Sequence, residues 1–183
     1  MGTQMVYVFL AQGFEEIEAL AVVDILRRAN VEVNTVGVGG KEIRGAHDIV
    51  VKADIIDTDV LDDNLDAIVL PGGMPGTLNL ENSRVVQEAI RVAVDNGAYI
   101  AAICAAPSIL GHLGLLAGKQ AVCYPGFEGT LEGASVAKTA VVKDGCFITG
   151  KGPGAAIPFA LELVKTLVNE ETAKNLKEAM QCQ

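Results

Sequence analysis

The 183-residue sequence has only two histidines, His47 and His112, and no tryptophan. Because imidazole is the side chain that most often exchanges protons and binds metals near neutral pH, this scarcity limits both kinds of chemistry. Four cysteines are present and none forms a CxxC pair: Cys104, Cys123, Cys146 and Cys182. The sequence therefore predicts neither a metal site built from His and Cys nor a bound cofactor.

Positive charge and long apolar runs are also scarce. Fourteen basic residues against 23 acidic ones give a formal net charge of −9, so a nucleic-acid backbone would be repelled. The first apolar run covers only residues 5–11, and no basic segment precedes it. It is too short for a secretion signal or a membrane span, so we expect a cytoplasmic protein with reduced thiols, and no nucleic-acid or membrane partner.

What the sequence does contain is a regular alternation of short β-branched runs with longer amphipathic ones. Half of the residues are hydrophobic, and the length suits one domain over residues 1–183. Strands are expected at 5–11, 31–38, 66–73 and 98–104, short antiparallel strands within 42–57, and a hairpin at 139–150. Helices are expected at 15–30, 82–97, 106–116, 152–169 and 170–181. This order predicts an α/β fold with a mainly parallel sheet, helices on both faces and a small antiparallel hairpin.

Ligands of such folds bind outside the carboxyl ends of the strands. Three segments of this chain should meet there, because each directly follows a predicted strand. These segments are residues 12–18, 71–76 and 104–107. The search for functional residues therefore concentrates on them.

Cys104 has small residues two positions before and after it, Ala102 and Ala106. A nucleophile held on a sharp strand-to-helix turn needs such small neighbours, because the turn is cramped. The start of the following helix would favour the thiolate. The pattern alone also fits a buried, inert cysteine, and that alternative stays open.

Two glycines and a carboxylate complete the candidate site. The strand ending at residue 73 closes in Gly72-Gly73, and the amide of Gly73 could bind a developing oxyanion together with that of Ala105; a plain tight turn is the alternative. Of Glu15, Glu16 and Glu18, the first two are interpreted as partners of the helix dipole. Glu18 lies further into the helix. If it faces the sheet end, it would approach Cys104. The pKa of its carboxyl group would then be raised, and it could share a proton with the thiol.

The segments LAQGFEEIEA, VLPGGMPG, AAICAAP and TGKGPGAAIPFAL resemble the ThiJ/PfpI superfamily in order and spacing. The likeness covers nearly the whole chain and is greatest to the branch of the Parkinsonism-associated deglycase and its bacterial relatives. It implies a flavodoxin-like sandwich that forms a homodimer. It further implies that Cys104 is a nucleophilic, easily oxidised cysteine hydrogen-bonded to Glu18. By the same resemblance, Gly72 and Gly73 line an oxyanion pocket, and Gly152 and Pro153 belong to its wall.

This chain departs from the family pattern at two positions. Ala105 stands where the protease-like branch has a histidine after the nucleophile, and Tyr124 stands where animal members have one. Tyrosine can donate a hydrogen bond but is a poor base near neutral pH. His112, eight residues beyond Cys104, is expected to serve packing or the surface, and His47 has no predicted place. A complete Cys-His-Glu triad is therefore not predicted.

The resemblance, together with the Cys104/Glu18 pairing, predicts a glutathione-independent glyoxalase or deglycase. The cysteine would add to small aldehydes such as methylglyoxal or act on glycated adducts, and Glu18 would move protons. A cysteine-based oxidative-stress sensor or chaperone without turnover is the second hypothesis. Amidase or peptidase activity is ranked third, because the histidine that such activity needs is missing.

Overall fold

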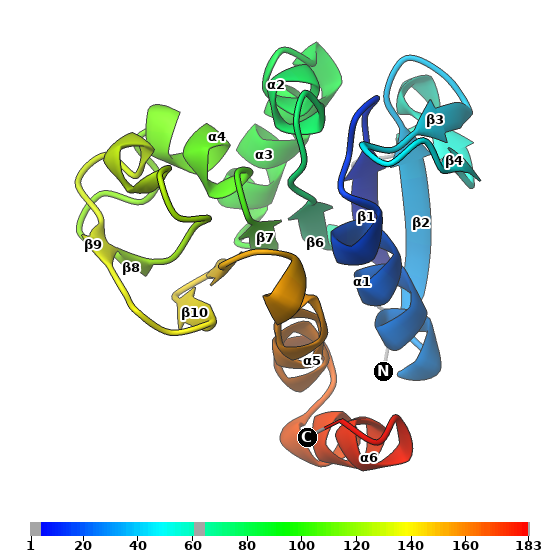
Figure 1. Ribbon diagram of the computed structural model, residues 1–183, viewed down its shortest axis with the longest axis vertical. Coiled ribbons are helices and arrows are strands. Elements are labelled where there is room, and N and C mark those ends of the chain that lie inside the picture. Colours follow the sequence, from blue (N-terminus) through cyan, green and yellow to red (C-terminus); the bar gives the residue numbers. More distant parts are fainter. Residues whose placement is uncertain (1–4, 61–64, 183) are drawn as a thin grey trace.

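The computed structural model describes residues 5–60 and 65–182 (Figure 1). Its strands are β1 (Met5–Leu10), β2 (Glu32–Gly37), β3 (Glu42–Arg44), β4 (Val50–Lys52), β5 (Ile55–Ile56), β6 (Leu65–Leu70), β7 (Tyr99–Ile103), β8 (Gln120–Ala121), β9 (Ser135–Val136), β10 (Val141–Asp144) and β11 (Phe147–Gly150). The α-helices are α1 (Glu16–Arg28), α2 (Gly76–Glu81), α3 (Arg84–Asn96), α4 (Pro107–His112), α5 (Ala156–Leu167) and α6 (Glu170–Ala179). Short 3₁₀ turns are η1 (Asp57–Asp59), η2 (Glu128–Thr130) and η3 (Pro153–Ala155).

Seven strands form one twisted sheet in the order β10-β11-β7-β6-β1-β2-β5. All neighbours run parallel except β10 and β11, which form the hairpin expected at 139–150. From β1 the chain moves to β2 on one side, and β6 and β7 are added on the other side. The strand order thus reverses direction between β1 and β6, which is where α/β sheets bind ligands. The predicted α/β class is confirmed.

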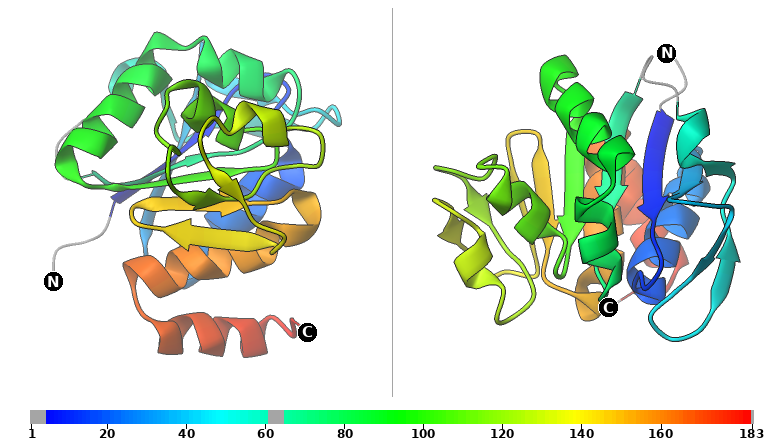
Figure 2. Two further views of the ribbon diagram at one scale, coloured as in Figure 1. Left: turned by 90° about the vertical axis from the view of Figure 1, so that its left-hand side faces the viewer. Right: turned by 90° about the horizontal axis from the view of Figure 1, so that it is seen from above.

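Two hydrophobic cores fill the spaces between this sheet and its helices. On one face α1 and α5 pack against Val6, Val8 and Leu10, and α6 covers α5. On the other face α3 and α4 pack against Tyr7, Phe9 and alternate residues of β6 and β7. The left view of Figure 2 shows the green helices above the sheet and the orange and red helices below it. This alternation along β1 explains why its run is apolar throughout, since both faces are buried.

The helix ends show which sequence signals were correct. The helix expected over 82–97 is present as α3, which Ser83 caps by accepting a hydrogen bond from Val86 and Gly97 ends in the left-handed conformation (φ 69°). The helix expected over 106–116 stops at His112. Gly111 packs so closely on the Thr130 carbonyl that a Cβ would lie 2.0 Å from its oxygen, and Gly114 adopts a φ of 70°.

Helix α2 and the β8–β9 pair were not predicted from sequence. Among the described residues, no helix is both long and apolar enough to cross a bilayer.

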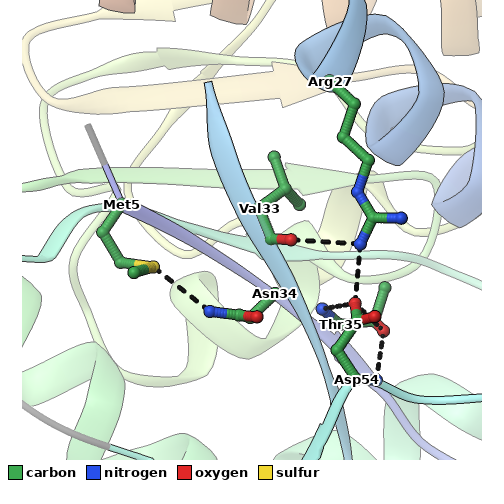
Figure 3. Close-up of polar contacts among 6 residues, drawn as sticks. All are labelled: Met5, Arg27, Val33, Asn34, Thr35 and Asp54. Atoms are coloured by element: carbon green, nitrogen blue, oxygen red, sulfur yellow. Dashed lines mark hydrogen bonds and ion pairs between the residues drawn. The ribbon is translucent and has the colours of Figure 1, made fainter. Parts of the chain in front are cut away.

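Asp54 joins the end of α1 to strands β2 and β5 (Figure 3). Its carboxylate accepts hydrogen bonds from the Thr35 amide at 2.9 Å and hydroxyl at 2.7 Å, and pairs with Arg27 at 2.7 Å. Thr35 Oγ1 in turn accepts the Asp54 amide at 2.9 Å. Burial acts to raise the pKa of Asp54, but the Thr35 bonds and the Arg27 charge outweigh it and hold the pKa below its ordinary value.

Replacing Asp54 by alanine is expected to lower the free energy of unfolding by about 2 kcal/mol, because several hydrogen bonds to one charged group are lost. The expected loss is no larger, because the Arg27 and Asp54 side chains are both partly exposed and water weakens their interaction. Urea unfolding measures it. Asp24→Ala is the matched control: it removes an exposed i,i+4 pair with Arg28, which should cost about 0.5 kcal/mol or less.

The hydrogen bonds and ion pair of Asp54 also determine how the free energy of unfolding changes with pH. A carboxylate with a lowered pKa stabilises the fold above its unfolded pKa of about 3.9, and this contribution disappears as the pH falls through the lower folded value. The stability difference between wild type and Asp54→Ala should therefore be full at pH 6 and shrink below about pH 4. A difference that grows on acidification would contradict this assignment.

Candidate active site

The site lies at the carboxyl ends of β1, β6 and β7, where three separate chain segments meet. Cys104 directly follows β7, Gly72 and Gly73 come after β6, and Glu18 lies in the first turn of α1 after β1. Figure 1 shows these strands next to one another in the middle of the sheet. The sequence-based expectation that the three segments converge is thus met by the topology.

Cys104 sits on a sharp turn between β7 and α4. Its φ is +66°, a left-handed conformation that costs a non-glycine residue roughly 1–2 kcal/mol. Ala102 and Ala106 on either side are fully buried, which leaves no room for larger neighbours. The turn is held by the Cys104 amide, which donates to the Gly150 carbonyl at 2.9 Å, and by its carbonyl, which accepts from Tyr124 at 2.8 Å. The elbow geometry predicted from the alanines is present.

Glu18 is completely buried and faces this cysteine. One carboxyl oxygen accepts a 2.8 Å hydrogen bond from the Gly72 amide. The carboxyl group adjoins Cys104, since both side chains lie against Gly72 and the thiol influences the pKa of Glu18, while its buried Oε1 atom has no hydrogen-bond partner among the described residues. The Gly72 amide therefore positions the carboxyl group and is not available to an oxyanion.

The two groups perturb one another's ionisation. Burial raises the pKa of Glu18 to about 7, against the opposing hydrogen bonds from Cys104 and Gly72. Burial and the Glu18 charge raise the pKa of Cys104 to about 12, and the amides of Ala105 and Gly73 act in the opposite direction. The thiol thus keeps its proton while Glu18 is ionised. Beside an ionised Glu18, Cys104 therefore rests as the thiol and not as the thiolate that the sequence suggested. The Glu18 carboxylate is the group that can accept the thiol proton.

Gly72 is required here because the backbone approaches both reactive side chains. A Cβ at this position would lie 2.5 Å from the Cys104 Cβ and 2.7 Å from Glu18 Oε2. Gly72→Ala should therefore reduce the free energy of unfolding by about 1–3 kcal/mol, the usual cost of overpacking. In Gly129→Ala the added methyl group meets nothing within 4 Å, and the change should stay within about 0.5 kcal/mol. Denaturant unfolding of both variants tests the contrast.

Tyr124, Gly152 and Pro153 line a cavity whose lining residues do not include Cys104 or Glu18. A hollow of about 390 Å³ is lined by residues of three loops: Tyr124, Pro125, Ala140, Lys151, Gly152, Pro153, Gly154 and Ala155. The Tyr124 ring packs on Gly152, where a Cβ would lie 3.1 Å from the ring. Tyr124 is connected to Cys104 through its backbone amide. The structure therefore groups Tyr124, Gly152 and Pro153 in one wall, and Lys151, which sequence reasoning missed, adds a positive charge.

Neither histidine is placed as the base of a triad. His112 contacts Glu81 of α2 at 2.6 Å, in keeping with its expected surface role. His47 lies in the loop between β3 and β4, with its ring 2.9 Å from Glu16 and 3.6 Å from Glu15. The Glu16 hydrogen bond and the Glu15 charge raise the pKa of His47.

The interpretation of Glu15 and Glu16 as helix-dipole partners was incomplete. Both are buried, with 9% and 4% of their surfaces exposed. Glu16 Oε1 accepts the amides of His47 at 2.8 Å and Ile49 at 3.4 Å, so it anchors the loop. Burial acts to raise the pKa of Glu16, but His47 and these amides lower it overall. No local sequence signal could reveal this, because His47 is 31 residues away.

Comparison with known proteins gives a consistent result. The family model described as the DJ-1/PfpI family matches residues 4–166. Protein dj-1beta of Drosophila melanogaster is 36% identical over 94% of each chain. The glutathione-independent glyoxalase DJR-1.2 of Caenorhabditis elegans is 33% identical, covering 88% of this chain and 87% of its own. The solved structure of oxidised Toxoplasma gondii DJ-1 superimposes with a TM-score of 0.94 at 35% identity over 98% of each chain.

Proposed function

Because the chain belongs to the DJ-1/PfpI family, we propose that it converts small reactive aldehydes such as methylglyoxal to hydroxy acids without glutathione. The observation that carries this proposal is the buried Glu18 carboxyl in contact with Cys104 on its elbow. A worm relative that is 33% identical is named a glutathione-independent glyoxalase, which supports the same assignment. In this proposal the substrate approaches Cys104 from the side of Tyr124, whose amide contacts the Cys104 carbonyl and whose ring lines the neighbouring cavity with Gly152 and Pro153.

The reaction begins with the carboxylate form of Glu18. The Cys104 sulfur attacks the aldehyde carbon, and the thiol proton passes to Glu18 as the carbon–sulfur bond forms. The amides of Gly73 and Ala105, which already face the sulfur, are placed to donate to the oxygen that becomes negative. Glu18 then returns this proton to the oxygen, which gives a hemithioacetal and leaves Glu18 ionised again.

Glu18 then moves a proton between the two carbons of the adduct. Removal of the hydrogen from the former aldehyde carbon gives an enediol, and return of a proton to the neighbouring carbon gives a thioester of the hydroxy acid. Water cleaves that thioester and restores the thiol. Methylglyoxal and one water thus give lactic acid, with no external oxidant or reductant. A deglycase reaction on glycated adducts would start from the same addition.

The direct test is to incubate the metal-free protein with methylglyoxal in the absence of glutathione and to quantify lactate. We expect one lactate per methylglyoxal consumed, with many turnovers per chain. Consumption that stops at one equivalent, with a stable adduct on Cys104, would contradict the proposed turnover.

An oxidation sensor is the second candidate, favoured by Tyr124 in place of a histidine base and by the oxidised state named for the Toxoplasma gondii relative. Glu18 and the two amides would then stabilise a sulfinate on Cys104. Peptide mass spectrometry after mild peroxide distinguishes it. Oxidation of Cys123 or Cys146 with Cys104 still reduced would eliminate this alternative.

A further inference from the structure

A second cluster of ionisable side chains lies beside the Cys104/Glu18 pair and takes no part in the proposed reaction. It consists of Glu15 and Glu16 at the start of α1 and His47 in the loop between β3 and β4. One ligand atom from each residue can be chosen so that all three lie within 4.8 Å of one another. The two carboxylates are buried and the His47 ring is 67% exposed, so the cluster opens to solvent on the histidine side.

Glu15 is the member whose position lacks a structural explanation. It is 9% exposed, and its carboxylate is ion-paired with the exposed ring of His47. The distance from Glu15 Oε1 to His47 Nδ1 is 3.6 Å, beyond hydrogen-bond distance. Two adjoining buried carboxylates thus share one exposed imidazole as their charged partner, and burying carboxylates is costly unless enough positive charge faces them. This arrangement calls for more positive charge than one exposed imidazole supplies.

Glu16 is already oriented for such a charge. Its Oε1 atom is fixed by the His47 and Ile49 amides, which leaves Oε2 directed at His47 Nδ1 at 2.9 Å. The distances of 2.9 and 3.6 Å from Nδ1 to the two carboxylates are close to the separation of about 3–3.5 Å expected for ligands that each lie about 2.0–2.2 Å from one ion. A cation can replace the hydrogen bond with little movement of the backbone.

We propose that Glu15, Glu16 and His47 form a binding site for a divalent transition metal. Two carboxylates and one imidazole suit Zn²⁺, Co²⁺ or Ni²⁺ better than Ca²⁺ or Mg²⁺, which prefer oxygen ligands alone. Water completes the coordination on the exposed side of His47. The metal neutralises the two buried carboxylates and ties the β3–β4 loop to the start of α1. The scarcity of histidine weighed against a His/Cys site, whereas this cluster takes most of its ligands from carboxylates.

Co²⁺ titration followed by visible absorption tests this site, because the spectrum also identifies the ligands. Metal-free wild type is expected to bind one Co²⁺ per chain with weak visible bands and without the intense near-ultraviolet thiolate band that a site at Cys104 would give. His47→Ala and Glu15→Gln should each weaken binding about tenfold or more. His112→Ala removes an exposed histidine paired with one carboxylate, and Cys104→Ser removes the nearby thiol. Both should leave the affinity unchanged.

The opposite results are equally clear. A strong thiolate band lost in Cys104→Ser would assign the metal to the cysteine and overturn the proposal. Absence of binding by wild type, or equal binding by wild type and His47→Ala, would overturn it too. Glu15→Gln preserves side-chain shape and His47 is exposed, and circular dichroism of each variant verifies its fold.

Discussion

Replacing Cys104 by serine is expected to reduce methylglyoxal turnover by at least about 10³-fold. The side chain keeps nearly the same size, but a serine hydroxyl holds its proton much more tightly and is a far weaker nucleophile. The buried Glu18, with a pKa of about 7, is too weak a base to compensate. Lactate formation under substrate saturation is the appropriate measurement.

Cys146→Ser provides the matched control for this variant. Cys146 is likewise a free, partly exposed cysteine, but it precedes β11 at the opposite end of the strand from the elbow. Its substitution should leave turnover within about twofold of wild type. Comparable losses in both variants would indicate general thiol chemistry and refute the assignment of Cys104. Full activity in Cys104→Ser would refute the mechanism.

Replacing Glu18 by glutamine is expected to lower kcat/KM by about 10²–10⁴-fold, the usual contribution of a positioned general base. Glutamine can still contact the Gly72 amide, so the local structure should be retained, whereas the amide cannot accept the thiol proton. Rates of methylglyoxal consumption and unfolding curves, recorded together, separate the chemical effect from a folding effect. A loss of activity that parallels a loss of folded protein would not support the role of Glu18 as a base.

The pH dependence of wild type carries the same information. Glu18 must be ionised to accept the thiol proton, so kcat/KM should rise with pH through about 7 and gain about tenfold between pH 6 and pH 8. EDTA in the buffers keeps metal away from Glu15, Glu16 and His47. Glu18→Gln should lose this rise. An activity that falls over this range would show that the protonated carboxyl is the active form.

The main elements of the fold could be predicted because their signals are local. Each of these signals depends only on residues next to one another in the chain. Examples are the apolar run at 66–73, Ser83 and Gly97 at the ends of α3, and Asp144-Gly145 in the hairpin. Helix α2 escaped prediction because its sequence, GTLNLE, begins with glycine and threonine and has no capping side chain. The β8–β9 pair joins two-residue strands far apart in sequence, a contact that no periodicity can reveal.

In the candidate site, too, local features could be predicted from the sequence and long-range contacts could not. The small residues around Cys104 indicated the elbow, and the paired glycines after β6 indicated a turn with exposed amides beside it. Sequence could not show that the Gly72 amide is used by Glu18, or that burial places the proton on the cysteine. It also missed the burial of Glu15 and Glu16, because their environment depends on a loop 31 residues away. Long-range burial, more than residue identity, determines these properties.

The two edges of the sheet limit how copies of this chain can associate. One edge ends in β5, which has two residues, and the other in β10, which has four and is antiparallel to its neighbour. Short edge strands expose few unpaired backbone groups, so they offer little template for adding a strand from another molecule. Continuous sheets across subunits and fibre-like stacking are therefore disfavoured. If two copies associate, as the family resemblance implies, we expect them to do so through helix and loop surfaces, leaving the order of strands in each copy unchanged.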